Sequence, residues 1–269
     1  MNTPALKVSE LSVWLETPEG HKQLVDSVSF SVDCGRTLGL VGESGCGKTM
    51  TAMAIMGLLN EHSLKISSAG IEINGKDISR LSRSQKRAVL GQDISMIFQQ
   101  PGTAFDPVFT IGHQIAAVVK RHLEGNQKQR HQAVLDALEQ VGFNHPQLVA
   151  SSYPHQLSGG MLQLAMIAMA MICKPSIIIA DEPTTALDAS TRALILDRLE
   201  KLQKAVNTSI LLISHDLSVI RRSCVDVMVM YCGRILEKTN RESLFSHARH
   251  PYSAGLLACV PRISSGPAI

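Results

Sequence analysis

A glycine-rich segment, GESGCGKTMTAM, extends from Gly42 to Met53. It fits the P-loop pattern G-x-x-x-x-G-K-[ST] in full. Glycines let the backbone curl so that loop N–H groups point at phosphate oxygens, and the following helix adds its positive dipole end. Lys48 supplies a charge to the same oxygens, and the Thr49 hydroxyl is a ligand for Mg²⁺. The sequence therefore predicts a polyphosphate site formed by Gly42, Glu43, Ser44, Gly45, Cys46, Gly47, Lys48 and Thr49.

Acidic residues follow an apolar segment, SIIIADEP, which begins at Ser176. Asp181 stands at the end of this predicted strand, where its carboxylate can support Mg²⁺ through a water. Glu182 comes next and is placed to act as general base toward an attacking water. His215 ends another strand-like segment, LLISHD, where its ring could hydrogen-bond the γ-phosphate. Tandem acids also suit an ordinary turn and a lone histidine often only packs, so these roles depend on the P-loop.

A second glycine-containing segment, LSGG, precedes a predicted helix. Ser158, Gly159 and Gly160 at a helix start form another candidate anion site. One nucleotide needs only one P-loop. The second site makes sense if two subunits meet head to tail and each completes the site of the other.

Apolar strands separated by helices must position these residues. The strand candidates are the alternating segment SVSFSV at 27–32 and the apolar segments 37–41, 93–98, 176–181, 209–214 and 226–231. Helical patterns cover 48–59, 159–173 and 189–205. The interval 111–152 has helical patterns and no strand candidate. This order predicts an α/β fold with a mainly parallel sheet covered on both faces, interrupted by a helical insertion.

Composition narrows the function classes. Of 269 residues, 45% are hydrophobic and 18% charged, which suits one large domain or two close subdomains. The formal net charge of +3, and a basic run at 79–87 without interleaved aromatics, predict no nucleic-acid partner. Six scattered cysteines without a C-x-x-C pair suit a reducing cytoplasm. No signal peptide or membrane span is predicted, so a membrane role would come through a partner.

The motifs together resemble the ATP-binding cassette (ABC) family. The P-loop, LSGG, IIIADEP, TALD (185–188) and SHD occur in that family's order, and IFQQP places Gln99 in its glutamine loop. The resemblance implies a P-loop NTPase core with a mainly parallel sheet, an antiparallel β-subdomain and a helical subdomain insertion. It implies one ABC nucleotide-binding domain over 1–269. Its predicted parts are the core with the β-subdomain at 1–98 and 165–246, the glutamine loop and helical subdomain at 99–164, and a short C-terminal extension at 247–269.

The same resemblance implies roles for individual residues. Glu182 would be the catalytic base and His215 the switch histidine, and Lys48 would complete the catalytic set. Ser158 would be offered to the γ-phosphate bound by a partner subunit. The implied cofactors are ATP and Mg²⁺, with metal contacts from Thr49, Gln99 and Asp181.

Longer segments resemble the ATPases of peptide/nickel importers, among them SSYPHQLSGGMLQLAMIAMAM and HPYSAGLLACVP. The implied function is ATP hydrolysis that powers an importer, and GGMLQ and AFDP favour a nickel or metallophore cargo over a small peptide. The implied partners are a second ABC ATPase subunit, two membrane permease subunits and, indirectly, a substrate-binding protein. A heterodimer of ATPases is favoured over a homodimer, at the cytoplasmic face of the inner or plasma membrane.

Two positions leave alternatives open. Trp14, beside Leu15 at the family's adenine-stacking position, stacks on adenine or packs under the sheet edge. Cys46 lies near a helix start, where a lowered thiol pKa would allow oxidative inhibition, or it is simply a small tolerated residue. The alternative functions are a soluble cassette ATPase of DNA repair or translation and a module that no longer hydrolyses ATP. The presence of Glu182 and His215 argues against the second.

Overall fold

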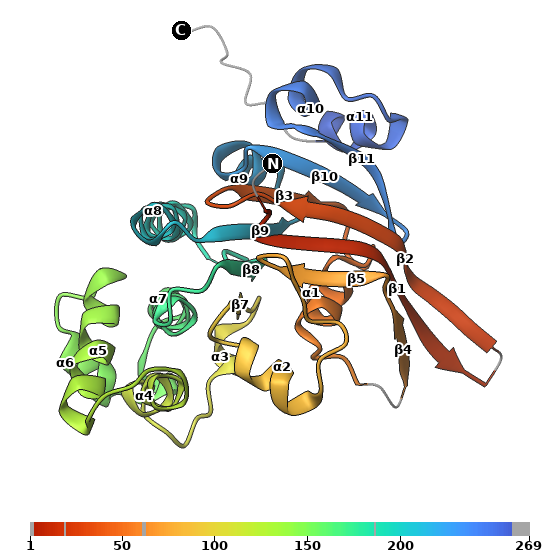
Figure 1. The fold of residues 1–269 in the computed structure, drawn as a ribbon. Coiled ribbons are helices and arrows are strands. Elements are labelled where there is room, and N and C mark those ends of the chain that lie inside the picture. The colour runs from red at the N-terminus through yellow and green to blue at the C-terminus, as the bar shows by residue number, and fades with distance from the viewer. Residues whose placement is uncertain (1–2, 19, 61–62, 186, 260–269) are drawn as a thin grey trace, which may run out of the picture.

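A larger, mostly parallel sheet forms the centre of the computed structural model, which describes residues 3–18, 20–60, 63–185 and 187–259 (Figure 1). Its six strands follow the order β11-β10-β3-β9-β8-β7. Only β11 pairs antiparallel with its neighbour in this sheet, as the described residues show. The strands are β3 (Thr37–Val41), β7 (Ile94–Ile97), β8 (Ile177–Asp181), β9 (Ser209–Ser214), β10 (Asp226–Tyr231) and β11 (Arg234–Asn240).

The central strands are buried on both faces, which is why their sequences are continuously apolar. In β8, Ile177 and Ile179 belong to one hydrophobic core and Ile178 and Ala180 to another. The core with Ile177 and Ile179 also contains buried residues of α1 and of a second, antiparallel sheet described below. The core with Ile178 and Ala180 contains buried residues of α7, α8 and α9. The helices are α1 (Lys48–Met56), α7 (Gly159–Met171), α8 (Ala189–Val206) and α9 (Leu217–Ser223).

A second, antiparallel sheet has the order β2-β1-β5-β6, with β4 paired to β1. Its strands are β1 (Leu6–Thr17), β2 (Gly20–Val32), β4 (Leu64–Ser67), β5 (Gly70–Ile73) and β6 (Lys76–Asp77). Val28, Phe30 and Val32 of β2 are buried, as the alternation predicts. The strand β1 was not predicted, because register shifts interrupt its alternation and Glu10 takes a positive φ of 51°.

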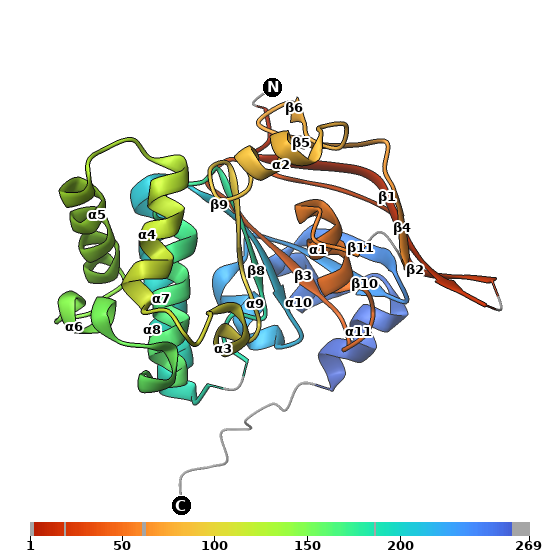
Figure 2. The same cartoon turned by 90° about the horizontal axis from the view of Figure 1, so that it is seen from below.

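Helices without strands occupy the interval between β7 and α7 in the described residues, as predicted. They are α3 (Pro101–Ala104), α4 (Ile111–His122), α5 (Gln127–Gln140), α6 (Pro146–Ser151) and a 3-10 turn at Pro154–Gln156. Figures 1 and 2 show α4, α5 and α6 beside α7, at the side of the molecule away from α11. The remaining helices are α2 (Arg83–Val89), α10 (Arg241–His247) and α11 (Pro251–Ala258).

The predicted fold class is confirmed: an α/β core with a mainly parallel sheet, an antiparallel β-subdomain and a helical insertion. The assignment of exact domain boundaries stays a prediction. Positions 260–269 of the predicted C-terminal extension, and Ala186 of the TALD segment, lie outside the described residues. Across the described part of the chain, no helix is both long and apolar enough to span a membrane.

Candidate functional site

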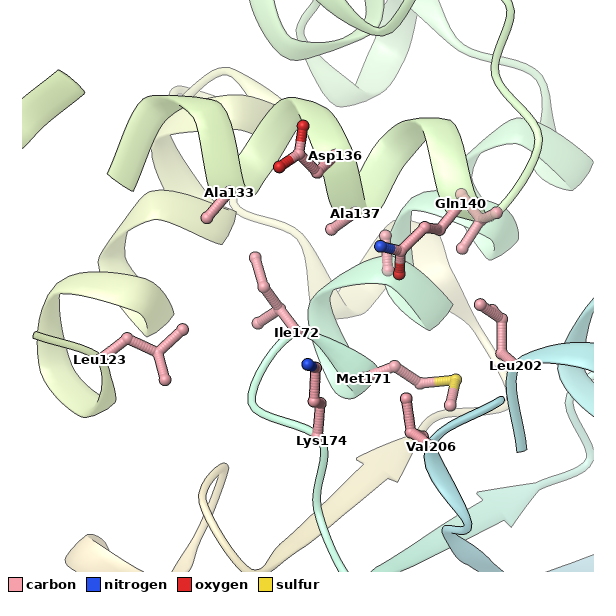
Figure 3. A pocket seen from close by; sticks show the side chains of 12 residues that line it. Leu123, Ala133, Asp136, Ala137, Gln140, Met171, Ile172, Lys174, Leu202 and Val206 are labelled. Atoms are coloured by element: carbon pink, nitrogen blue, oxygen red, sulfur yellow. The ribbon is translucent and has the colours of Figure 1, made fainter. Parts of the chain in front are cut away.

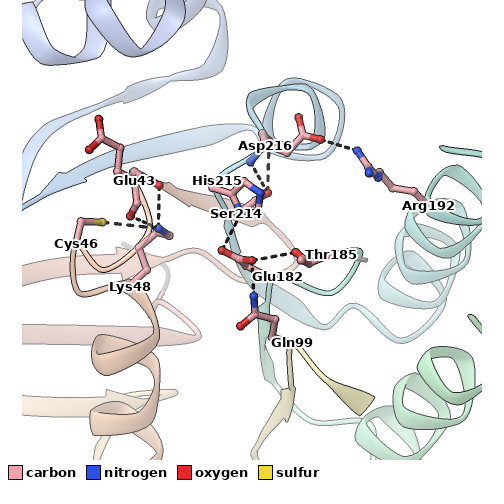
Figure 4. Close-up of polar contacts among 11 residues, drawn as sticks. Glu43, Cys46, Lys48, Gln99, Glu182, Thr185, Arg192, Ser214, His215 and Asp216 are labelled. Carbon is pink, nitrogen blue, oxygen red and sulfur yellow. Dashed lines mark hydrogen bonds and ion pairs between the residues drawn. The ribbon is translucent and has the colours of Figure 1, made fainter. Parts of the chain in front are cut away.

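Strand register brings the predicted site residues to one edge of the larger sheet. Val41, which precedes the P-loop, pairs with Ser214 of β9, and Asp181 of β8 pairs with Ile213. Carboxyl ends of neighbouring parallel strands meet at the same edge. The P-loop, the acidic pair and the segment after β9 therefore emerge side by side, and Figure 4 shows Lys48, Glu182 and His215, one from each of them.

The P-loop curls around the ammonium group of Lys48. This side chain is buried, and its Nζ donates to the backbone carbonyls of Gly42 at 2.8 Å and Glu43 at 2.7 Å. Gly47, which precedes α1, adopts a φ of 111° that favours glycine. The loop thus holds a cation in place and aligns the start of α1, which is the arrangement that a polyphosphate requires.

Gly42 has no room for a side chain. A Cβ at this position would lie 2.2 Å from the carbonyl oxygen of Met230 and 2.8 Å from Sγ of Cys46. We expect Gly42→Ala to push the loop away from β10 and to lower ATP affinity about five- to 150-fold, because such overpacking costs about 1–3 kcal/mol. Equilibrium ATP binding measures this loss. Gly102→Ala is the matched control, since a Cβ there meets no atom within 4 Å; equal affinities of the two variants would contradict the prediction.

The burial and hydrogen bonding of Asp181 suit a residue that supports a metal ion. It is 2% exposed, and its Oδ1 has no hydrogen-bond partner in the described structure. Burial raises the pKa of its carboxyl, and a hydrogen bond from the Thr49 hydroxyl acts in the opposite direction. A buried unpaired carboxylate oxygen beside a hydroxyl fits Mg²⁺, a hard cation that takes oxygen ligands and retains waters. The residues present therefore fit the predicted metal.

Glu182 is the centre of a hydrogen-bond network. Its Oε2 accepts from Nε2 of Gln99 at 2.8 Å and from the Thr185 hydroxyl at 2.9 Å, and its Oε1 lies 2.9 Å from Nδ1 of His215 (Figure 4). Burial alone would raise the pKa of this carboxyl, but the hydrogen bonds of His215 and Thr185, together with the charges of His215 and Lys48, outweigh burial and lower it. Glu182 is therefore ionised at neutral pH, as a proton acceptor must be.

Thr185, Arg192 and Asp216 contribute to this part of the site, although the sequence motifs predict no role for them. Nη1 of Arg192 in α8 donates to Asp216 at 2.7 Å, and its Nη2 donates to the Leu187 carbonyl at 3.3 Å. Asp216 follows His215 directly, so this ion pair ties the TALD segment to the histidine. Thr185 lies in the TALD motif and Asp216 in the SHD motif, so the sequence carried a signal for both. Arg192 lies inside a helix and carries no such signal.

The LSGG residues do not join the network. Ser158 caps α7 by accepting from the Met161 N–H at 3.3 Å. A Cβ on Gly160 would lie 2.7 Å from Cγ2 of Thr191, so this helix start packs closely on α8. Among the described residues, no hydrogen bond joins Ser158, Gly159 or Gly160 to the P-loop of the same chain.

Trp14 lies half-buried in β1, opposite Gln23 of β2 and Lys65 of β4. The Leu24 carbonyl of β2 is 2.9 Å from where a Cβ on Gly47 would sit, so β2 passes beside the P-loop. Stacking of Trp14 on adenine stays a prediction.

The expected lowering of the Cys46 pKa is wrong. Burial raises the pKa of this thiol and outweighs the nearby Lys48 ammonium. The side chain is 7% exposed and packs into the hydrophobic core under β1 and β2. A protonated, buried thiol is a poor nucleophile, which favours the alternative of a small tolerated residue.

A cavity of about 270 Å³ lies elsewhere, between α5 and the carboxyl ends of α7 and α8 (Figure 3). Apolar side chains such as Met171, Leu202 and Val206 line it, with Lys174 at one side. It contains none of the predicted site residues. The chemistry is therefore assigned to the sheet edge and not to this cavity.

Comparisons with known proteins agree on one family. Residues 25–185 match the ABC transporter family. The chain is 45% identical over 258 residues to the dipeptide transport ATP-binding protein DppD of Bacillus subtilis (strain 168), covering 96% of this chain and 77% of that protein. It is 41% identical over 259 residues to DppD of Escherichia coli (strain K12), covering 96% and 79%. The oligopeptide transport ATP-binding protein AppD of B. subtilis is also 41% identical, with 96% and 79% covered.

Solved structures agree with the fold. A dimeric bacterial ABC transporter cassette superposes with a TM-score of 0.78 at 23% identity, covering 88% of this chain and 98% of that one. A dimeric post-hydrolysis state of an ATP-binding cassette, bound to ADP and Pi, gives a TM-score of 0.77 with the same identity and coverage.

Proposed function

The chain belongs to the ABC transporter family, and from this premise we propose that it is the ATP-hydrolysing subunit of a peptide importer. The observation that carries the hydrolytic part is the network around Glu182. An ionised carboxylate is held by Gln99, Thr185 and His215 at the sheet edge where the P-loop begins. A binding module without hydrolysis would not require this arrangement.

In the proposed mechanism, the P-loop N–H groups and Lys48 bind the β- and γ-phosphates. Lys48 exchanges the carbonyls of Gly42 and Glu43 for phosphate oxygens. Glu182 accepts a proton from the water that attacks the γ-phosphate, and Gln99 orients that water. Mg²⁺, held by Thr49 and supported by Asp181, would neutralise charge on the phosphates. Nδ1 of His215 donates to the Glu182 carboxylate, which fixes the ring, and in the imidazolium form Nε2 would donate to a γ-phosphate oxygen.

The working unit that we propose is a head-to-tail dimer of ATPase subunits. The start of α7 packs on α8 and has no described contact with its own P-loop. Ser158, Gly159 and Gly160 are thus available to complete the nucleotide site of a second subunit. Pairing with a different ATPase subunit is preferred over a homodimer. Two membrane permeases and a substrate-binding protein complete the proposed importer, with this chain at the cytoplasmic face of the membrane.

A peptide is the cargo that the relatives support best. The similar proteins above are named for dipeptide and oligopeptide transport. The nickel or metallophore cargo favoured by GGMLQ and AFDP has no such support and is the alternative outcome of the cargo test. A soluble ATPase of DNA repair or translation is not favoured, because these relatives are transport proteins.

The cargo test is uptake of a labelled dipeptide, beside labelled nickel with and without a chelator, in cells whose chromosomal copy carries Lys48→Ala. We expect dipeptide uptake to fall to background while nickel uptake is unchanged, because the importer would lose its ATP-driven step. The wild-type gene on a plasmid should restore uptake. Selective loss of nickel uptake would instead establish the metal branch, and no change in either would reject both cargoes.

A further inference from the structure

The C-terminal helix α11 reaches the P-loop, although the two contacting residues lie 209 positions apart in the sequence. The hydroxyl of Tyr252 accepts a hydrogen bond from the backbone N–H of Glu43, with an N···O distance of 3.3 Å. Figure 2 shows α11 beside the connection between β3 and α1. The helix belongs to the segment HPYSAGLLACVP, which has no role in the proposed mechanism.

The start of α11 is fixed to the larger sheet. Glu237 of β11 is 8% exposed, and its carboxylate accepts from the backbone N–H groups of Arg249 at 3.0 Å and His250 at 3.1 Å. Nδ1 of His250 accepts from the N–H of Tyr252 at 3.1 Å, which caps the helix. A buried carboxylate with two backbone donors is a firm anchor. Tyr252 is therefore held at a set position relative to β11.

The ring of Tyr252 is also fixed. It packs against the ring of Tyr231, with centroids 4.5 Å apart. Tyr231 ends β10 directly after Met230, whose carbonyl abuts the position of a Cβ on Gly42. The end of β10 thus contacts both the P-loop and α11, and the tyrosine hydroxyl bridges the remaining distance to Glu43.

Glu43 is held on both sides of its Cα. Its N–H donates to Tyr252, and its carbonyl accepts from Nζ of Lys48 at 2.7 Å. The same carbonyl also accepts from the Cys46 N–H at 3.3 Å, within the loop. When Lys48 turns to phosphate oxygens, the contact with Lys48 is given up, and the contact with Tyr252 is the described hydrogen bond that still ties Glu43 to a part of the fold outside the loop. We propose that Tyr252 is a positioning residue for the P-loop, through which α11 raises the affinity of this chain for a nucleoside polyphosphate. This inference rests on the proposed function, because it takes the P-loop as the nucleotide site.

The test compares ATP, ADP and AMP binding to the full chain by calorimetry, in the wild type and in Tyr252→Phe. Phenylalanine keeps the ring contact with Tyr231 and removes only the hydroxyl. A hydrogen bond of ordinary strength predicts that Kd for ATP and ADP rises about two- to tenfold. AMP lacks the β-phosphate that the loop cradles, so its Kd should change by less. In hydrolysis assays KM should rise by the same factor as Kd, with a smaller change in kcat.

Tyr231→Phe is the matched control, because the described hydrogen bonds do not connect its hydroxyl with the P-loop. Thermal unfolding without nucleotide checks that both variants fold like the wild type. An unchanged ATP affinity in Tyr252→Phe would overturn the inference, and so would equal losses in the two variants or an equal loss for AMP. Failure of the wild type to bind ATP would instead reject the proposed function.

Discussion

Glu182→Gln is expected to bind ATP with wild-type affinity and to lose hydrolysis by about 100- to 10,000-fold, the usual contribution of a general base. The amide cannot accept the proton of the attacking water. The Glu182 network predicts how the amide will sit. Gln99 and Thr185 both donate to Oε2, so the new oxygen takes that side and the NH₂ group faces Nδ1 of His215. Nδ1 then accepts from the amide, in the tautomer that carries the ring proton on Nε2. The residue thus keeps its place while losing its charge.

In the proposed dimer the subunits separate after hydrolysis, so the same variant should accumulate as an ATP-bound dimer. Phosphate release measures turnover, and size-exclusion chromatography in Mg-ATP measures the dimer. Glu139→Gln makes the same change at an exposed position of α5 and should behave as the wild type. Hydrolysis by Glu182→Gln at the wild-type rate would show that another group is the base.

Lys48→Ala is expected to weaken nucleotide binding, the step that precedes hydrolysis. Hydrogen bonds to charged groups contribute about 1.5–3 kcal/mol, so loss of the ammonium should weaken ATP binding by about 10- to 100-fold. In the absence of nucleotide the effect is different. The ammonium donates to the Gly42 and Glu43 carbonyls, so its removal leaves two loop acceptors without this donor and loosens the loop.

Calorimetric titration with ATP and with AMP separates these effects, because phosphate-dependent affinity should be lost while the fold persists in circular dichroism. Lys120→Ala, at an exposed position near the end of α4, is the control for removing one positive charge. Tight ATP binding by Lys48→Ala would contradict the assignment of the P-loop. A variant that binds ATP normally and only hydrolyses it slowly would place Lys48 in catalysis rather than in binding.

The local elements of this protein follow from its amino-acid sequence alone. The glycine pattern at 42–49, the apolar strands and the helix starts depend on backbone sterics and on periodicity within a few residues. Strands β3, β8, β9 and β10 and helices α1, α7 and α8 therefore lie within two or three residues of their predicted positions. The resemblance to a family supplied what local patterns could not, the antiparallel β-subdomain, since bulges in β1 hide its alternation.

Which side chains contact one another depends on how these elements pack in the tertiary fold. The register of β8 against β9, and of β9 against β3, places Glu182 and His215 within 2.9 Å of each other and beside the P-loop. Burial, which is a property of the packed molecule, raises the Cys46 pKa where position near a helix start alone suggested a lowered one. The contact of Tyr252 with Glu43 joins residues 209 positions apart. Such contacts follow from how strands and helices pack, because packing joins residues whose separation in sequence carries no periodic signal.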